Sequence, residues 1–112
     1  MSVNINHLKR QDDRRMVVWF LSYDRDNQLS EVMLHTCFEA HGKDIDEDEL
    51  SDAIQWLYQK GLVTIQRIEG VDFILLTNDG LKVAKGRINI KGVRNLRNSE
   101  RAEIKAFHQR NG

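Results

Sequence analysis

The stretch LVTIQRIEGVDFILLT, residues 62–77, decides the fold. Its two ends, 62–68 and 73–77, are rich in the β-branched, aromatic and aliphatic residues that favour strands. Between them EGVD is a short connection that contains a glycine, as hairpin loops do. We therefore predict an antiparallel hairpin. An isolated hairpin is marginally stable in water, so it must pack against other parts of the chain.

The segment before the hairpin, DIDEDELSDAIQWLYQKG (44–61), predicts a helix with well-defined ends. Asp46 is a suitable N-cap, and Glu49 completes a capping box with it. Gly61 ends the helix, as glycine commonly does. The hydrophobic staple and the inward side come from apolar residues at helical spacing, which are Ile45, Leu50, Ala53, Ile54 and Leu57.

Two more helices are predicted nearer the start of the chain. The first covers 12–21 with Asp12 or Asp13 as its N-cap, and a shorter helical piece at 5–10 precedes or joins it. The second begins after Ser30 and ends at Gly42. Its apolar stripe is predicted to contain Val32, Met33, Cys37 and Phe38.

After the hairpin, Thr77 can cap a short helix over 78–85, and RINIKGV continues as an extended or irregular path. Ser99 can cap a last helix over 99–109, which either docks on the body, pairs with another subunit or stays frayed. The order of helix, helix, helix, hairpin and short helix is that of a winged helix. The fold class is thus α+β, mostly α, with a winged-helix domain at 1–90 and a basic C-terminal extension at 91–112.

Longer sequence patterns carry a specific resemblance. WLYQKGLVTIQRIEGVDFILLTNDGLKVAKG, at 56–86, resembles the winged-helix signature in which W-L-x-x-x-G-L-V ends a helix and L-T-x-x-G opens the next one. DDRRMVVWFL (12–21) and GLKVAKGRINIKGVRN (80–95) are similar to segments of the small winged-helix proteins of Mu-like phages and prophages. That resemblance implies a DNA-binding fold. It covers about residues 10–95, and it does not extend to the tail that follows Arg97.

Composition excludes several classes of protein. The chain has 112 residues with no proline and one cysteine, Cys37, so we expect one small domain without an internal disulfide, in the reducing cytoplasm of a bacterial host cell. No apolar run approaches a membrane span, and MSVNINHLKR is not a secretory signal. Nucleotide-binding loops and catalytic elbows are absent from the sequence, so we expect a non-enzyme that needs no cofactor. His35, Cys37 and His41 lack the spacing of a zinc site.

Charge is distributed unevenly along a chain of zero net charge. Residues 1–79 hold 8 Lys/Arg against 15 Asp/Glu, a balance of −7, whereas residues 80–112 hold 9 against 2, a balance of +7. Such a cationic tail either binds phosphate or an acidic partner, or folds against its own acidic body. The sequence favours the two interpretations equally.

The helix before the hairpin stands where a winged helix usually keeps its DNA-recognition helix. Ser51, Gln55 and Gln59 face outward and suit base contacts. Lys60 is the one cation of this helix, whereas most affinity for duplex DNA comes from Lys/Arg at phosphates. The helix start is instead crowded with carboxylates, which repel phosphate while stabilising the helix itself: Asp46, Glu47, Asp48 and Asp52.

Two functions compete on these grounds. The first is a dimeric winged-helix DNA-binding module for transcription regulation, whose phosphate contacts come from the wing and the basic third of the chain: Arg67, Lys82, Lys85, Arg87, Lys91 and Arg94. The alternative is a protein-interaction module that docks the acidic helix on a basic partner and does not bind DNA. For either function the expected homodimer contacts are Ile5, Leu8, Ile104 and Phe107.

Overall fold

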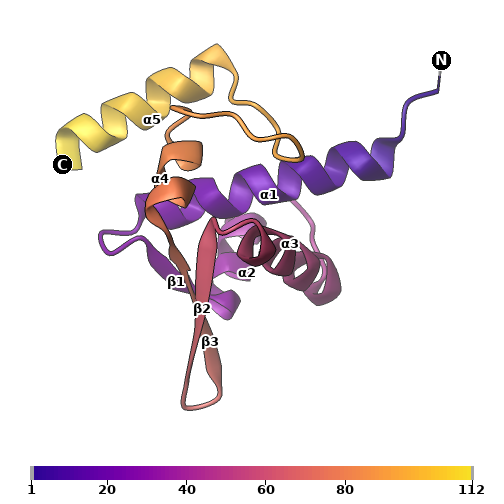
Figure 1. Ribbon diagram of the computed structural model, residues 1–112, viewed down its shortest axis with the longest axis vertical. Coiled ribbons are helices and arrows are strands. Elements are labelled where there is room, and N and C mark those ends of the chain that lie inside the picture. Colours follow the sequence, from indigo (N-terminus) through magenta and orange to yellow (C-terminus); the bar gives the residue numbers. More distant parts are fainter. Residues whose placement is uncertain (1, 112) are drawn as a thin grey trace.

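The computed structural model describes residues 2–111. Residue 1 of the domain predicted at 1–90 and residue 112 of the extension predicted at 91–112 lie outside the described residues. Helix α1 (Ile5–Tyr23) runs through the middle of the molecule (Figure 1). Asn4 caps it by accepting a hydrogen bond from His7 N–H at 3.1 Å. The predicted helix over 12–21 and the piece at 5–10 are therefore one helix. The expected Asp12 or Asp13 cap is wrong, because both lie inside α1 and pair with distant cations.

Helices α2 (Glu31–Ala40) and α3 (Glu47–Gln59) complete the three-helix core, and their predicted caps are confirmed. The Ser30 hydroxyl accepts a hydrogen bond from Met33 N–H. Asp46 and Glu49 form the reciprocal capping box of α3, at 2.7 and 3.0 Å. The predicted inward side of α3 is buried. The stripe expected on α2 is partly wrong: Phe38 is buried, as is Leu34, while Val32 and Met33 are 72% and 48% exposed.

The predicted hairpin is confirmed as β2 (Val63–Ile68) and β3 (Val71–Leu76), paired antiparallel. Its turn is shorter than expected, because only Glu69 and Gly70 lie outside the strands. Both have positive φ, 51° and 80°, as in the type I′ turns that match the twist of a hairpin. A third strand, β1 (Gln28–Ser30), was not predicted. It pairs with β3, which gives the order β1-β3-β2.

Thr77 caps α4 (Asn78–Ala84) as predicted, and residues 86–97 then follow an irregular path to α5 (Asn98–Asn111). The expected Ser99 cap is wrong: α5 begins one residue earlier, and the Glu100 carboxylate accepts a hydrogen bond from Arg97 N–H at 2.7 Å. Val93, Leu96 and Ile104 join the same hydrophobic core as the three helices. Residues 86–97 and α5 lie on the opposite side of α1 from the wing tip (Figure 1).

Candidate functional site

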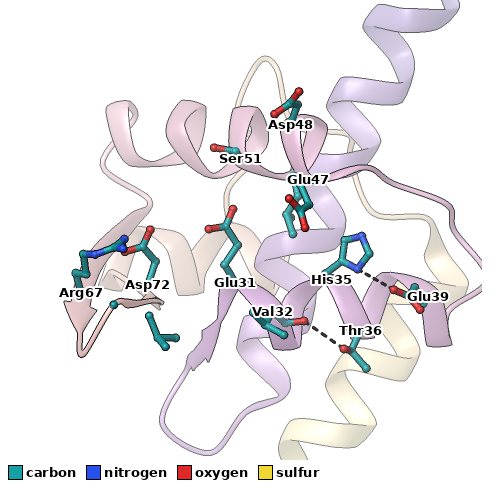
Figure 2. A pocket seen from close by; sticks show the side chains of 13 residues that line it. Glu31, Val32, His35, Thr36, Glu39, Glu47, Asp48, Ser51, Arg67 and Asp72 are labelled. Atoms are coloured by element: carbon teal, nitrogen blue, oxygen red, sulfur yellow. Dashed lines mark hydrogen bonds and ion pairs between the residues drawn. The ribbon is translucent and has the colours of Figure 1, made fainter.

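A groove of about 620 Å³ opens between α2, the start of α3 and the tip of the wing (Figure 2). We call it the acidic groove, because five carboxylates line it: Glu31, Glu39, Glu47, Asp48 and Asp72. The first two come from α2, the next two from the first turn of α3, and the last from β3. Three separate elements thus bring negative charge to one hollow.

Few cations balance this charge. Arg67 is the one guanidinium among the described lining residues, and it already donates to Asp72 at 2.9 Å. His35 contacts Glu39 at 2.7 Å and bonds the Ile45 carbonyl through its other ring nitrogen. Within residues 2–111 no ion pair neutralises Glu31. Burial raises the pKa of Glu31, and the neighbouring charges of Asp72 and Glu47 raise it further.

The candidate binding residues predicted on the third helix do not form one surface in the structure. Ser51 lies in the acidic groove beside Asp48. Asp46 is engaged in the capping box, and Asp52 lines a separate small hollow with Lys9 and Arg10 of α1. Gln55 and Gln59 are exposed on the second half of α3.

Trp56, between these glutamines, connects α3 to the chain after α4. Its half-buried ring lies under the Arg14 guanidinium, 4.2 Å away, and near the Lys60 ammonium at 5.4 Å. A Cβ added to Gly92 would lie 2.5 Å from this ring, so the two groups are in close contact. The exposed Lys91 therefore lies next to the C-terminal half of α3, the end at which Lys60 also lies.

Other predicted cations differ in availability. Lys82, Arg87 and Lys91 are exposed, and among the described residues none of them has an ion-pair partner. Lys85 is half-buried. Arg94 is engaged in a network: it donates to Asp12 at 2.5 Å and to both Glu100 oxygens at 2.9 and 3.0 Å.

The network around Arg94 ties the DDRR segment of α1 to the chain after α4. Asp12 also pairs with Lys43. Arg14 donates to the Gly92 carbonyl at 2.9 Å. The buried Arg15 donates to the carbonyls of Arg94 and Val83, both at 2.7 Å. The two sequence patterns shared with the phage group therefore contact each other and hold the molecule together.

Sequence reasoning found the carboxylates of α3 but missed Glu31 and Asp72 as members of the same site. The two residues are far apart in sequence, and the strand pairing of Ser30 with Phe73 places them next to each other. A sequence prediction that residues 28–30 form a strand paired with β3 would have identified Glu31 and Asp72 as neighbours. No cluster within residues 2–111 is arranged to hold a metal ion, and none of the helices described is long and apolar enough to cross a membrane.

Comparisons with known proteins agree with this architecture. No family model matches the chain. The chain is 34% identical over 86 residues to an uncharacterized protein, gp26 of Escherichia phage Mu, and the match covers 77% of this chain and 90% of that protein. Its structure is similar to HlyU from Vibrio cholerae N16961, with a TM-score of 0.50 and 22% identity, over 97% of this chain and 96% of the other. The second likeness supports the fold.

Proposed function

The chain belongs to the family of gp26 of Escherichia phage Mu and has a winged-helix fold, and from this premise we propose that it is a DNA-binding regulatory module. Duplex DNA is held by the C-terminal half of α3 together with the cationic chain that follows α4. The observation that carries this proposal is the contact of Trp56 with Gly92. It brings Lys91 to the end of α3 that carries Lys60 and the exposed Gln55 and Gln59.

Physical chemistry favours this end of α3 over its start. Cations that neutralise phosphates release counterions and supply most of the affinity for duplex DNA. Lys60 and Lys91 are exposed and available for this role, and Gln55 and Gln59 can bond the adenine edge. At the start of α3, Glu47 and Asp48 repel phosphate, and the wing arginine is paired with Asp72.

The test is fluorescence anisotropy of a labelled mixed-sequence duplex titrated with the protein at several salt concentrations. We expect affinity to fall steeply with salt, and Lys60→Gln/Lys91→Gln to reduce the log–log slope by about 2, since each lost phosphate contact removes about 0.9. Lys105→Gln/Arg110→Gln on α5 removes the same charge elsewhere and serves as the control. The proposal is refuted if no binding occurs at low salt, or if the control variant lowers the slope equally.

A further inference from the structure

We infer that the acidic groove is the docking site for a cationic segment of a protein partner, one that also carries aliphatic side chains. This inference does not depend on DNA binding, since the groove lies at the opposite end of α3 from the proposed DNA contacts. It rests on three features of the groove: unbalanced charge, the spacing of the carboxylates and exposed valines.

The charge of the groove is only partly balanced within the chain, since Glu39 and Asp72 have cationic or histidine partners and Glu31 has none among residues 2–111. Figure 2 shows Glu31 from α2 and Glu47 from α3 extending into the space between the two helices, with Asp72 on the wing beside them. Like charges brought together in a partly desolvated hollow destabilise one another. Burial raises the pKa of Glu31, and the nearby charges of Asp72 and Glu47 raise it further. A cation placed between these groups relieves the repulsion, so the groove is complementary to positive charge.

The carboxylates are spread along the groove and do not converge on a point. No three His, Cys, Asp or Glu side chains in the described part of the chain are placed to bind one metal ion. Asp72 is already paired with Arg67, so cations from outside the chain are needed to meet Glu31 and Glu47. Lys and Arg side chains carried on one polypeptide provide them at intervals, and they match carboxylates with charge-assisted hydrogen bonds.

The groove also presents aliphatic surface. Val32 and Val71 line it while 72% and 39% exposed, and Met33 beside Val32 is 48% exposed. Val32 and Met33 belong to α2, whereas Val71 begins β3 at the wing tip, so exposed apolar side chains stand on both sides of the groove. A small polyamine or a single ion gains little from contact with valines, whereas a protein segment with leucine or isoleucine between its basic residues buries them. The volume of about 620 Å³ is in the range of sites that hold a few side chains.

The experiment uses the full chain and two fluorescein-labelled synthetic peptides, one of lysine, arginine and leucine and one with serine in place of leucine. Binding is measured by anisotropy, and the site is located by backbone amide shifts in NMR. We expect the leucine peptide to bind at the groove, with Glu31→Gln/Glu47→Gln weakening it about tenfold. Val32→Ser should weaken the leucine peptide and leave the serine peptide unchanged.

The control is Asp44→Asn/Glu103→Gln, which removes two exposed charges outside the groove. The inference is wrong if this control weakens the leucine peptide as much as the groove variant does, because binding is then unspecific attraction. Equal binding of the two peptides overturns the aliphatic part of the inference, and amide shifts confined to another surface overturn the site. Failure of the DNA titration leaves each of these outcomes unaffected, so the two proposals can fail separately.

Discussion

Single residues of the DDRR segment show why two distant sequence patterns occur together. Arg15 is fully buried on α1 and reaches carbonyls on α4 and on the chain beyond it. Arg14 reaches Gly92, and Asp12 reaches Arg94. Since three of the four DDRR residues, Asp12, Arg14 and Arg15, bond to the later pattern, the two patterns serve the same packing, and neither is evidence of DNA contact.

Arg15→Lys is expected to destabilise the fold by about 2–3 kcal/mol. Burial lowers the pKa of Arg15 to about 10, and the charge is tolerated because the planar guanidinium donates in two directions at once. A lysine ammonium is a point donor and leaves a buried carbonyl without a partner. Urea unfolding followed by circular dichroism measures the change, with Arg25→Lys on the exposed loop as control. A loss equal to that of the control contradicts the role given to Arg15.

Gly92→Ala tests the contact with Trp56. The residue has φ of 100°, and an added Cβ would lie 2.5 Å from the indole ring, so both backbone strain and a clash oppose it. We expect a loss of about 3 kcal/mol and a shift in tryptophan fluorescence. Gly70→Ala separates the two causes, because that glycine has φ of 80° with nothing within 4 Å, and strain alone of about 1–2 kcal/mol applies. Equal losses in both variants would show that the ring contact is unimportant.

At the scale of elements, the sequence predicted what depends on local chemistry. The caps of α2, α3 and α4 and the hairpin were identified, because each depends on residues within one or two turns of chain. Features that depend on residues far away in the sequence were not identified. Strand β1 has three residues and exists through its pairing with β3, and Asp12 resembled a cap because its partner Arg94 is far along the chain.

The candidate site follows the same rule. The carboxylates of α3 and the basic run after residue 80 are visible in the sequence, because each is contiguous. Their positions relative to each other are not visible, since it is the contact of Gly92 with Trp56 that places Lys91 beside the end of α3. The wing and α2 then add Asp72 and Glu31 to the acidic end.

Helix α5 is predicted to lose part of its attachment to the rest of the molecule at low pH. Burial alone would raise the pKa of Glu100, but hydrogen bonds from Arg94 and from Arg97 N–H outweigh it and lower the pKa below its ordinary value of 4.5. A lowered carboxyl pKa means that this stabilisation is present above about 4.5 and is lost as pH falls through the folded-state value. We expect α5 amides to lose hydrogen-exchange protection over this range.

Glu100→Gln separates the effect of Glu100 on acid stability from the effects of two other carboxyls. The pKa of Asp12 is also lowered, so Asp12 also loses stabilisation as pH falls. Burial raises the pKa of Asp13, so Asp13 changes stability with pH in the opposite direction. The variant should be less stable than the wild type at neutral pH, and the difference should shrink as pH falls below about 4.5. A difference that stays constant with pH contradicts the role of the Glu100 charge.

At the scale of the whole molecule, the charge asymmetry of the chain is only partly cancelled by folding. Arg94 pairs with Asp12, which agrees with the interpretation that the basic tail folds against the acidic body. Lys82, Arg87 and Lys91 stay exposed, which agrees with the interpretation that the tail is available to phosphate or to an acidic partner. The result is a molecule with an acidic groove at the start of α3 and exposed cations on the chain from α4 onward. The two proposed contacts, one with duplex DNA and one with a cationic protein segment, use separate surfaces of this molecule.

The exposed start of α1 leads to a prediction about assembly. Of the four residues expected at a homodimer contact, Ile104 is buried and Phe107 stacks on Tyr23 with ring centroids 4.0 Å apart, so α5 uses its apolar side within the chain. Ile5 and Leu8 remain 61% and 50% exposed where α1 extends beyond the body (Figure 1). We expect α1 to pair there with a second copy, because two exposed aliphatic residues one turn apart form an apolar stripe.

Sedimentation equilibrium over a range of protein concentrations tests this pairing. We expect a reversible dimer, and Ile5→Ser/Leu8→Ser should shift it to monomer by weakening association at least about tenfold, since each aliphatic side chain removed from an interface costs about 1 kcal/mol or more. Val32→Ser/Met33→Ser removes a comparable exposed apolar pair from α2 and should leave the dimer intact. A wild-type chain that stays monomeric at every concentration refutes the prediction, and a dimer broken only by the α2 variant moves the contact to the acidic groove.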